Sequence, residues 1–88
     1  MHKGKDIVLT IGKDELKFNV DIASYNRLQN ELTVDKKVSP MVNFVRRSLI
    51  DASQLSLLNK YLDRGLALEI AGLLMEEFRG EIEIAVKK

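Results

Sequence analysis

The chain has 88 residues and an almost balanced charge, which together predict one small domain without a strong electrostatic field. The hydrophobic patterning along the chain predicts that this domain has an α+β fold. Its 14 basic and 13 acidic side chains leave a formal charge of +1, so charge alone attracts neither nucleic acid nor an anionic membrane. The absence of cysteine excludes disulfides and thiolate metal sites. No apolar run approaches the roughly 20 residues of a membrane span. We therefore expect a cytoplasmic protein whose single domain covers residues 1–88, with residues 1–5 flexible.

The first element is predicted to be a β-hairpin. Apolar and polar residues alternate with a period of two on both sides of a polar stretch that opens with Gly12. This alternation places one row of apolar side chains on a single inner face: Ile7, Leu9, Ile11, Leu16, Phe18 and Val20.

Two helices are expected next, joined by a polar loop over residues 33–39. Asp21 can cap the first helix, whose apolar stripe begins at Ile22 and continues through Tyr25, Leu28 and Leu32. The pair Ser39–Pro40 predicts the start of the second helix, which should run to about Asp51. A short break at Ala52–Ser53 follows.

The third and fourth helices are predicted over residues 54–64 and 66–79, each ending at a glycine that can adopt the left-handed cap conformation, Gly65 and Gly80. Residues 82–86 then alternate again, with three apolar side chains on one face. A lone strand must pair, so we expect it to complete a three-stranded sheet with the hairpin. The strand over residues 7–11 would lie in the centre, with the four helices on one face of the sheet.

The residues offer no catalytic, cofactor or metal site. His2 is the only histidine, and it lies at a terminus; without cysteine, a nucleophile–base pair would depend on this one side chain. Glu76 and Glu77 are adjacent on a helix and point about 100° apart. The glycine spacing fits no phosphate-binding loop. We therefore predict a protein that is not an enzyme and acts by binding.

The helices carry more apolar surface than a small core requires. In the fourth helix, apolar residues cover roughly 220° of the circumference, whereas a surface helix needs about 100°. Either the neighbouring helices enclose it or an apolar patch faces a protein partner. For the second alternative, the predicted protein-binding residues are Leu57, Tyr61, Leu68 and Met75, with Ile50 as an apolar anchor beside Arg46 and Arg47 on the second helix.

Three stretches resemble the small tail assembly chaperones of tailed bacteriophages and prophages. The first is Asp-Ile-Val-Leu-Thr-Ile-Gly from Asp6 with Glu-Leu-Lys-Phe-Asn-Val up to Val20. The second is Lys-Val-Ser-Pro from Lys37, followed by Asn43–Phe44. The third is Ala-Leu-Glu-Ile-Ala-Gly from Ala67, with Glu76–Glu77 and the closing Glu-Ile-Glu-Ile-Ala-Val-Lys-Lys.

The resemblance implies a protein without enzymatic activity that works in the cytoplasm of an infected or lysogenic bacterium. It would bind the tape-measure protein and keep this extended, partly apolar client soluble during tail assembly. Homo-oligomerisation through unpaired sheet edges would assist this role. Two alternatives remain: an oligomeric structural tail protein, or a small nucleic-acid-binding regulator that uses Lys36, Lys37, Arg46 and Arg47.

Overall fold

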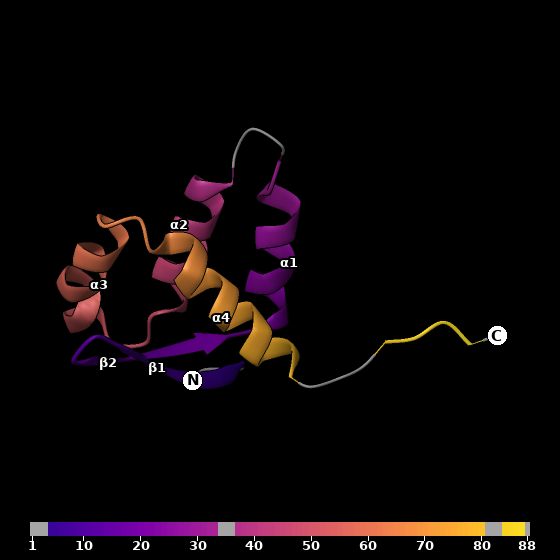
Figure 1. Ribbon diagram of the computed structural model, residues 1–88, viewed down its shortest axis with the longest axis horizontal. Coiled ribbons are helices and arrows are strands. Elements are labelled where there is room, and N and C mark those ends of the chain that lie inside the picture. The colour runs from indigo at the N-terminus through magenta and orange to yellow at the C-terminus, as the bar shows by residue number, and fades with distance from the viewer. Residues whose placement is uncertain (1–3, 34–36, 81–83, 88) are drawn as a thin grey trace.

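The fold is a β-hairpin covered on one face by helices, seen in a computed structural model that describes residues 4–33, 37–80 and 84–87 (Figure 1). The hairpin forms one layer and the helices form the other. Within the described ranges the elements are β1 (Lys5–Ile11), β2 (Asp14–Val20), α1 (Ile22–Glu31), α2 (Val38–Ser48), the 3₁₀ turn η1 (Ala52–Gln54), α3 (Leu55–Leu62) and α4 (Ala67–Arg79). None of these helices is long and apolar enough to cross a bilayer.

The predicted hairpin and its inner face are confirmed. β1 and β2 pair antiparallel from Lys5 opposite Val20 to Ile11 opposite Asp14. Gly12 turns the chain with φ +61°, a left-handed conformation that favours glycine. Four of the six inner-face residues are buried, and the other two, Leu9 and Ile11, pack against the core from the side.

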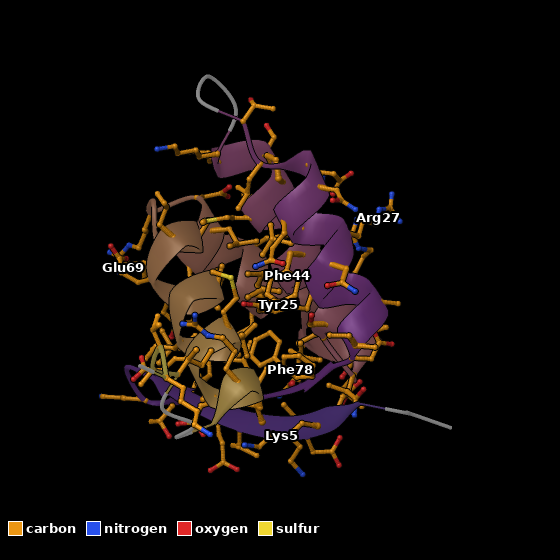
Figure 2. The ribbon with its side chains drawn as sticks, turned by 90° about the vertical axis from the view of Figure 1, so that its right-hand side faces the viewer. Lys5, Tyr25, Arg27, Phe44, Glu69 and Phe78 are labelled. Carbon is orange, nitrogen blue, oxygen red and sulfur yellow. The ribbon has the colours of Figure 1, made fainter. Side chains whose placement is uncertain are left out.

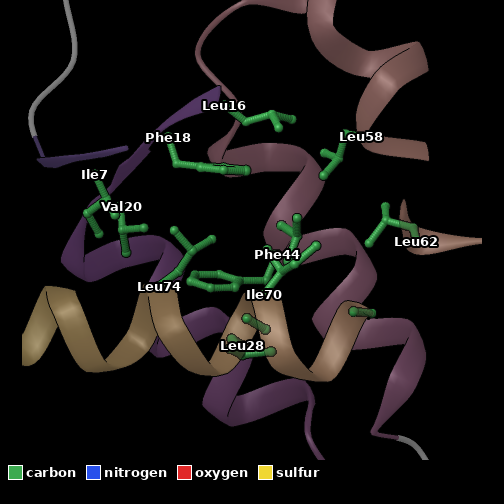
Figure 3. Packing of buried hydrophobic residues seen from close by; sticks show 13 residues of the cluster. Ile7, Leu16, Phe18, Val20, Leu28, Phe44, Leu58, Leu62, Ile70 and Leu74 are labelled. Atoms are coloured by element: carbon green, nitrogen blue, oxygen red, sulfur yellow. The ribbon is translucent and has the colours of Figure 1, made fainter. Parts of the chain in front are cut away.

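The hairpin and all four helices contribute to one apolar core (Figure 3). Phe18 of β2 and Phe44 of α2 are its largest fully buried side chains. The other buried apolar residues are Ile7, Leu16, Val20, Leu28, Val45, Leu58, Leu62, Ala67, Ile70, Ala71 and Leu74. Because α4 supplies four of these residues, its buried face holds the helical layer together.

Helix α1 begins as predicted, with the Ser24 N–H donating to the Asp21 carboxylate at 2.7 Å. This hydrogen bond lowers the pKa of Asp21 below its ordinary value. The predicted inward stripe is only partly right, since Leu28 is buried whereas Ile22 is 60% exposed. Ile22 is the first residue of the helix, and it lines a surface depression instead of packing in the core.

Helix α2 differs from the prediction at both ends. It begins at Val38, so Ser39 is not its cap, and Pro40 lies in the first turn, where a missing N–H costs no hydrogen bond. It ends at Ser48, before Asp51, because Leu49 becomes extended and forms a β-bridge with Phe18. The Ile50 N–H then donates to the Lys17 carbonyl at 3.1 Å. Hydrogen bonding to the edge of β2 therefore replaces the last predicted helical turn.

Both glycines have the predicted positive φ, +82° at Gly65 and +70° at Gly80. Gly80 is the C-cap of α4 as predicted, whereas α3 ends at Leu62, before the predicted end at residue 64, and its C-cap is Asp63. The predicted third strand is not part of the described sheet, which is the two-stranded hairpin alone. Residues 84–87 are described and carry no regular secondary structure, while residues 82 and 83 of that predicted strand lie outside the described ranges. The central position expected for β1 therefore stays a prediction.

Candidate protein-binding surface

One flank of α4 carries an apolar strip that the rest of the described chain does not cover. Leu68, Gly72 and Met75 follow one another at intervals of four and three residues, which places them on the same side of the helix. Leu68 is 46% exposed, and Met75 is half-buried with one side against the core. We call these three residues the α4 strip.

Gly72 has no side chain, so the middle of the α4 strip lies closer to the helix backbone than the two ends. A Cβ atom added at this position would meet no other atom within 4 Å. The glycine is therefore not needed for packing inside the domain, although in a helix interior it costs about 0.5–1 kcal/mol relative to alanine. Between two larger apolar side chains, it leaves a saddle into which the backbone of another helix could fit closely.

Leu73 is also exposed, at 50%, but it lies on another side of α4. One residue along a helix corresponds to a rotation of about 100°, so five residues from Leu68 places Leu73 roughly 140° away. The neighbouring helices therefore do not enclose α4. Part of its excess of apolar residues is exposed on the surface.

On α3, Leu57 and Tyr61 are brought together beside a surface depression of about 500 Å³ that Asp14, Lys60, Asp63 and Arg64 also line. The Tyr61 hydroxyl donates to the Asp14 carboxylate at 2.5 Å and lies 3.0 Å from the Ile11 carbonyl. The bond to Asp14, with partial burial, raises the pKa of Tyr61. Tyr61 therefore connects α3 to the hairpin turn by hydrogen bonds, a role that the helical spacing did not reveal.

The basic pair on α2 is held by intramolecular contacts that point to different neighbours. The Arg46 side chain donates through Nε to Asn59 of α3 at 3.1 Å. Arg47 lies 3.6 Å from Glu31 of α1, which Arg27 also approaches at 3.6 Å. The two guanidinium groups thus connect α2 to two other helices and form no common basic surface. Of the other predicted basic pair, Lys37 is exposed and Lys36 lies outside the described residues.

Ile50 does not occupy the position expected of an exposed helical anchor. It follows α2 in the segment bonded to β2 and is half-buried there. It therefore does not share a helix face with Arg46 or Arg47, and the predicted combination of the three residues on α2 is wrong. Continuous helical periodicity through residue 51 gave no signal for this change of direction.

A second depression, of about 520 Å³, lies where the start of α1 meets the end of α4, and sequence reasoning missed it. Gly4, Lys5, Asp21, Ile22, Ala23 and Phe78 line it. Figure 2 shows Phe78 between Tyr25 and Lys5. The ring centroids of Phe78 and Tyr25 are 5.3 Å apart. The exposure of Ile22 was the missing information, because its spacing alone had assigned it to the core.

In the part of the chain that the structure describes, the charged side chains do not gather into a site for chemistry. Among the described residues, no group of three or more Asp, Glu or His side chains is placed to hold a metal ion. The shifted pKa values of Asp21 and Tyr61 each follow from a local hydrogen bond that stabilises the fold. The α4 strip, in contrast, is apolar.

A family model described as phage tail assembly chaperone matches residues 7–88. The chain belongs to this family. The resemblance read from the hairpin, the start of α2 and the end of the chain is thereby confirmed. No curated protein and no solved structure matches the chain. The chaperone's match includes every described helix and both strands except the first two residues of β1.

Proposed function

We propose that this tail assembly chaperone binds the tape-measure protein of its phage through the α4 strip. It would act without catalysis, in the cytoplasm of the host bacterium, before the tail tube forms around the client. Membership of the family supports the general role. The observation that carries the binding proposal is the uncovered strip formed by Leu68, Gly72 and Met75.

The shape of the strip favours a helical client. An apolar helix can lie against a flank of α4 with its backbone over Gly72 and its side chains beside Leu68 and Met75. Methionine is unbranched and flexible, so one site can accept apolar side chains of different shapes. The resemblance implies that the tape-measure protein is long, helical and apolar in stretches, which supplies many such segments.

The small size of the strip suits reversible binding. Three residues form a contact well below the roughly 800 Å² per partner of a stable protein interface. Each copy would bind weakly, and many copies along one client would together shield it. Weak individual contacts would also allow release when the tube subunits assemble around the tape-measure protein.

The decisive experiment is co-production of the chaperone with the tape-measure protein encoded by the same phage. We expect the client to remain in the supernatant and to co-elute with the chaperone. Replacing Leu68→Asp should remove both effects, because a carboxylate would be buried against apolar side chains without a partner.

Leu73→Asp is the matched control. It introduces the same charge at a similarly exposed leucine of the same helix, but about 140° away from the strip. Equal loss of client binding in both variants would refute the assignment to the α4 strip. If the tape-measure protein stayed insoluble with and without the chaperone, the proposed chaperone function itself would be refuted. Finding the protein in finished particles by mass spectrometry would instead identify a structural subunit.

A further inference from the structure

Among the described residues, no hydrogen-bonding partner occupies the outer edge of β1, which we call the open edge, whereas the segment after α2 bonds to the outer edge of β2. On β2, the Lys17 carbonyl accepts from the Ile50 N–H at 3.1 Å, and the Gln54 side chain donates to the Glu15 carbonyl at 3.0 Å. Ile11 and Asp14 close the two-residue turn, so the backbone groups of Asp6, Val8 and Thr10 face away from β2. No hydrogen bond from the described residues reaches them there. One side of the hairpin can therefore accept a further strand.

The segment that follows α4 has the composition of a strand but no strand partner. Ile84 and Val86 alternate with Ala85 and Lys87, and the two large apolar side chains are 94% and 84% exposed. Figure 1 shows this segment, in yellow, apart from the hairpin. The family match continues through it to residue 88, so the segment belongs to the domain that defines the family.

The segment leaves the domain at the Lys5 end of β1. Lys5 donates through Nζ to the Glu77 carbonyl at 2.6 Å, and Gly80 lines the same hollow as these two residues. A segment that followed β1 of its own chain would run from the Lys5 end towards Ile11, parallel to that strand. An antiparallel arrangement would require residue 82 to lie opposite Ile11, about 20 Å from Lys5. The two residues after Gly80 span only about 7 Å.

Antiparallel pairing is nevertheless the arrangement that the side chains favour. With Ile84 opposite Leu9, Val86 lies opposite Ile7 and Lys87 opposite Asp6. The two apolar residues would then cover the half-buried Leu9 at the edge of the core, and opposite charges would meet on the outer face. The parallel register that keeps Ile84 beside Leu9 would instead place the Glu81 carboxylate beside Asp6. Parallel strands also require both faces to be covered, whereas this hairpin has a polar outer face.

We propose that residues 84–87 of one copy pair as an antiparallel strand with the open edge of β1 in a second copy. The segment of a second copy can approach this edge in the favoured direction, because it is not joined to Gly80 of the same chain. Each copy offers one segment and one open edge. Two copies can therefore exchange segments and form a closed dimer; if they do not, the same contact repeats from copy to copy and forms an open assembly. The proposal does not depend on client binding, because it uses a different surface.

The test measures the average molar mass of the full chain in solution by sedimentation equilibrium over a wide range of concentrations. We expect the wild-type chain to associate as its concentration rises, and a chain carrying Ile84→Asp with Val86→Asp to remain a monomer. Both side chains are exposed in the single copy, so these changes cannot unfold it. The control is Leu73→Asp, another exposed apolar residue, which should associate like wild type.

A mixing experiment separates segment from edge. Val8→Pro removes an outward N–H from the edge while leaving the bonds to β2, a position at which edge strands tolerate proline. Alone, this variant should be monomeric. Mixed with the Ile84→Asp, Val86→Asp chain, which keeps its edge, it should form a one-to-one heterodimer.

Hydrogen exchange supplies a readout that does not depend on the fold of the proline variant. In the wild-type chain the Val8 amide should become more protected as concentration rises, and in the doubly substituted chain it should not. A monomeric wild-type chain at all concentrations would overturn the proposal. Association that survives the double substitution would do the same.

Discussion

Replacing Gly72 by alanine should separate the stability of the chaperone from its binding. The residue lies in the interior of α4, between Ala67 and Arg79, and an added Cβ meets no atom within 4 Å. Because nothing opposes the methyl group, the gain in helix propensity should appear in full, raising the free energy of unfolding by about 0.5–1 kcal/mol. For a domain of this size that corresponds to a rise in Tm of roughly 2–8 °C.

Client binding should change in the opposite direction. If a helix of the tape-measure protein lies close over Gly72, the methyl group overpacks the contact, at a cost of about 1–3 kcal/mol. This cost corresponds to a Kd raised roughly five- to 150-fold. Thermal unfolding measures the first effect, and titration with an apolar helical peptide from the client measures the second.

The result that would refute this reasoning is a stabilised variant that binds the peptide as tightly as wild type. Helix packing over the saddle would then be wrong, although Leu68 and Met75 could still contact the client. A variant with lowered Tm would refute a different step, because it would mean that Gly72 is needed inside the domain. Ala71 offers no equivalent control because it is buried, whereas Glu69→Ala changes an exposed residue of the same helix outside the strip.

Substitutions of Leu74, Asp21 and Tyr61 test the fold that positions these surfaces. Leu74→Ala should lower the free energy of unfolding by roughly 2–5 kcal/mol in urea denaturation, because the side chain is fully buried, whereas Leu73→Ala should change it by less than about 0.5 kcal/mol. Asp21→Ala removes the cap of α1 and should cost about 1 kcal/mol at neutral pH. The capping bond lowers the pKa of Asp21, so the stability difference between Asp21→Ala and wild type should be complete above about pH 5 and shrink as the pH falls through the lowered pKa. The variant Asp21→Asn caps the helix without titrating, so its capping contribution should not be lost at low pH. Tyr61→Phe should lower Tm, because it removes the hydrogen bond from α3 to Asp14. Since the pKa of Tyr61 is raised, the stability that this hydrogen bond gives the wild-type chain should be present below about pH 10 and lost as the pH rises through the raised pKa. A variant with an unchanged Tm and the same alkaline decline as wild type would contradict that role of Tyr61.

The sequence predicted the elements whose signals are local. Alternation defined the inner face of the hairpin, Asp21 marked the start of α1, and Gly80 marked the end of α4. Each of these depends on a residue type acting within a few positions along the chain. The end of α2 has no such signal, because Leu49 and Ile50 leave the helix in order to bond to a strand that lies about 30 residues earlier.

The candidate surface was harder to predict for a related reason. Periodicity showed that α4 has more apolar residues than one buried face needs, but not which neighbours cover it. Ile70 and Leu74 are buried, whereas Leu68 and Leu73 stay exposed on different sides of the same helix. Tyr61 looked equally available on α3, yet its hydroxyl is bonded to Asp14. These distinctions arise from tertiary contacts that leave no pattern in the spacing.

The two proposed contacts use separate parts of the chain, and this has a consequence for how the chaperone would shield a long client. The α4 strip lies on a flank of its helix, whereas self-association uses the segment after that helix and the open edge of β1. Filling one surface therefore leaves the other free. Copies joined through their segments would hold several strips at fixed spacing, so a client helix bound to one strip meets the next at high effective concentration. The doubly substituted monomer should consequently keep its affinity for a single short peptide but lose avidity for the full-length tape-measure protein. Equal loss for both ligands would mean that the two surfaces are not independent.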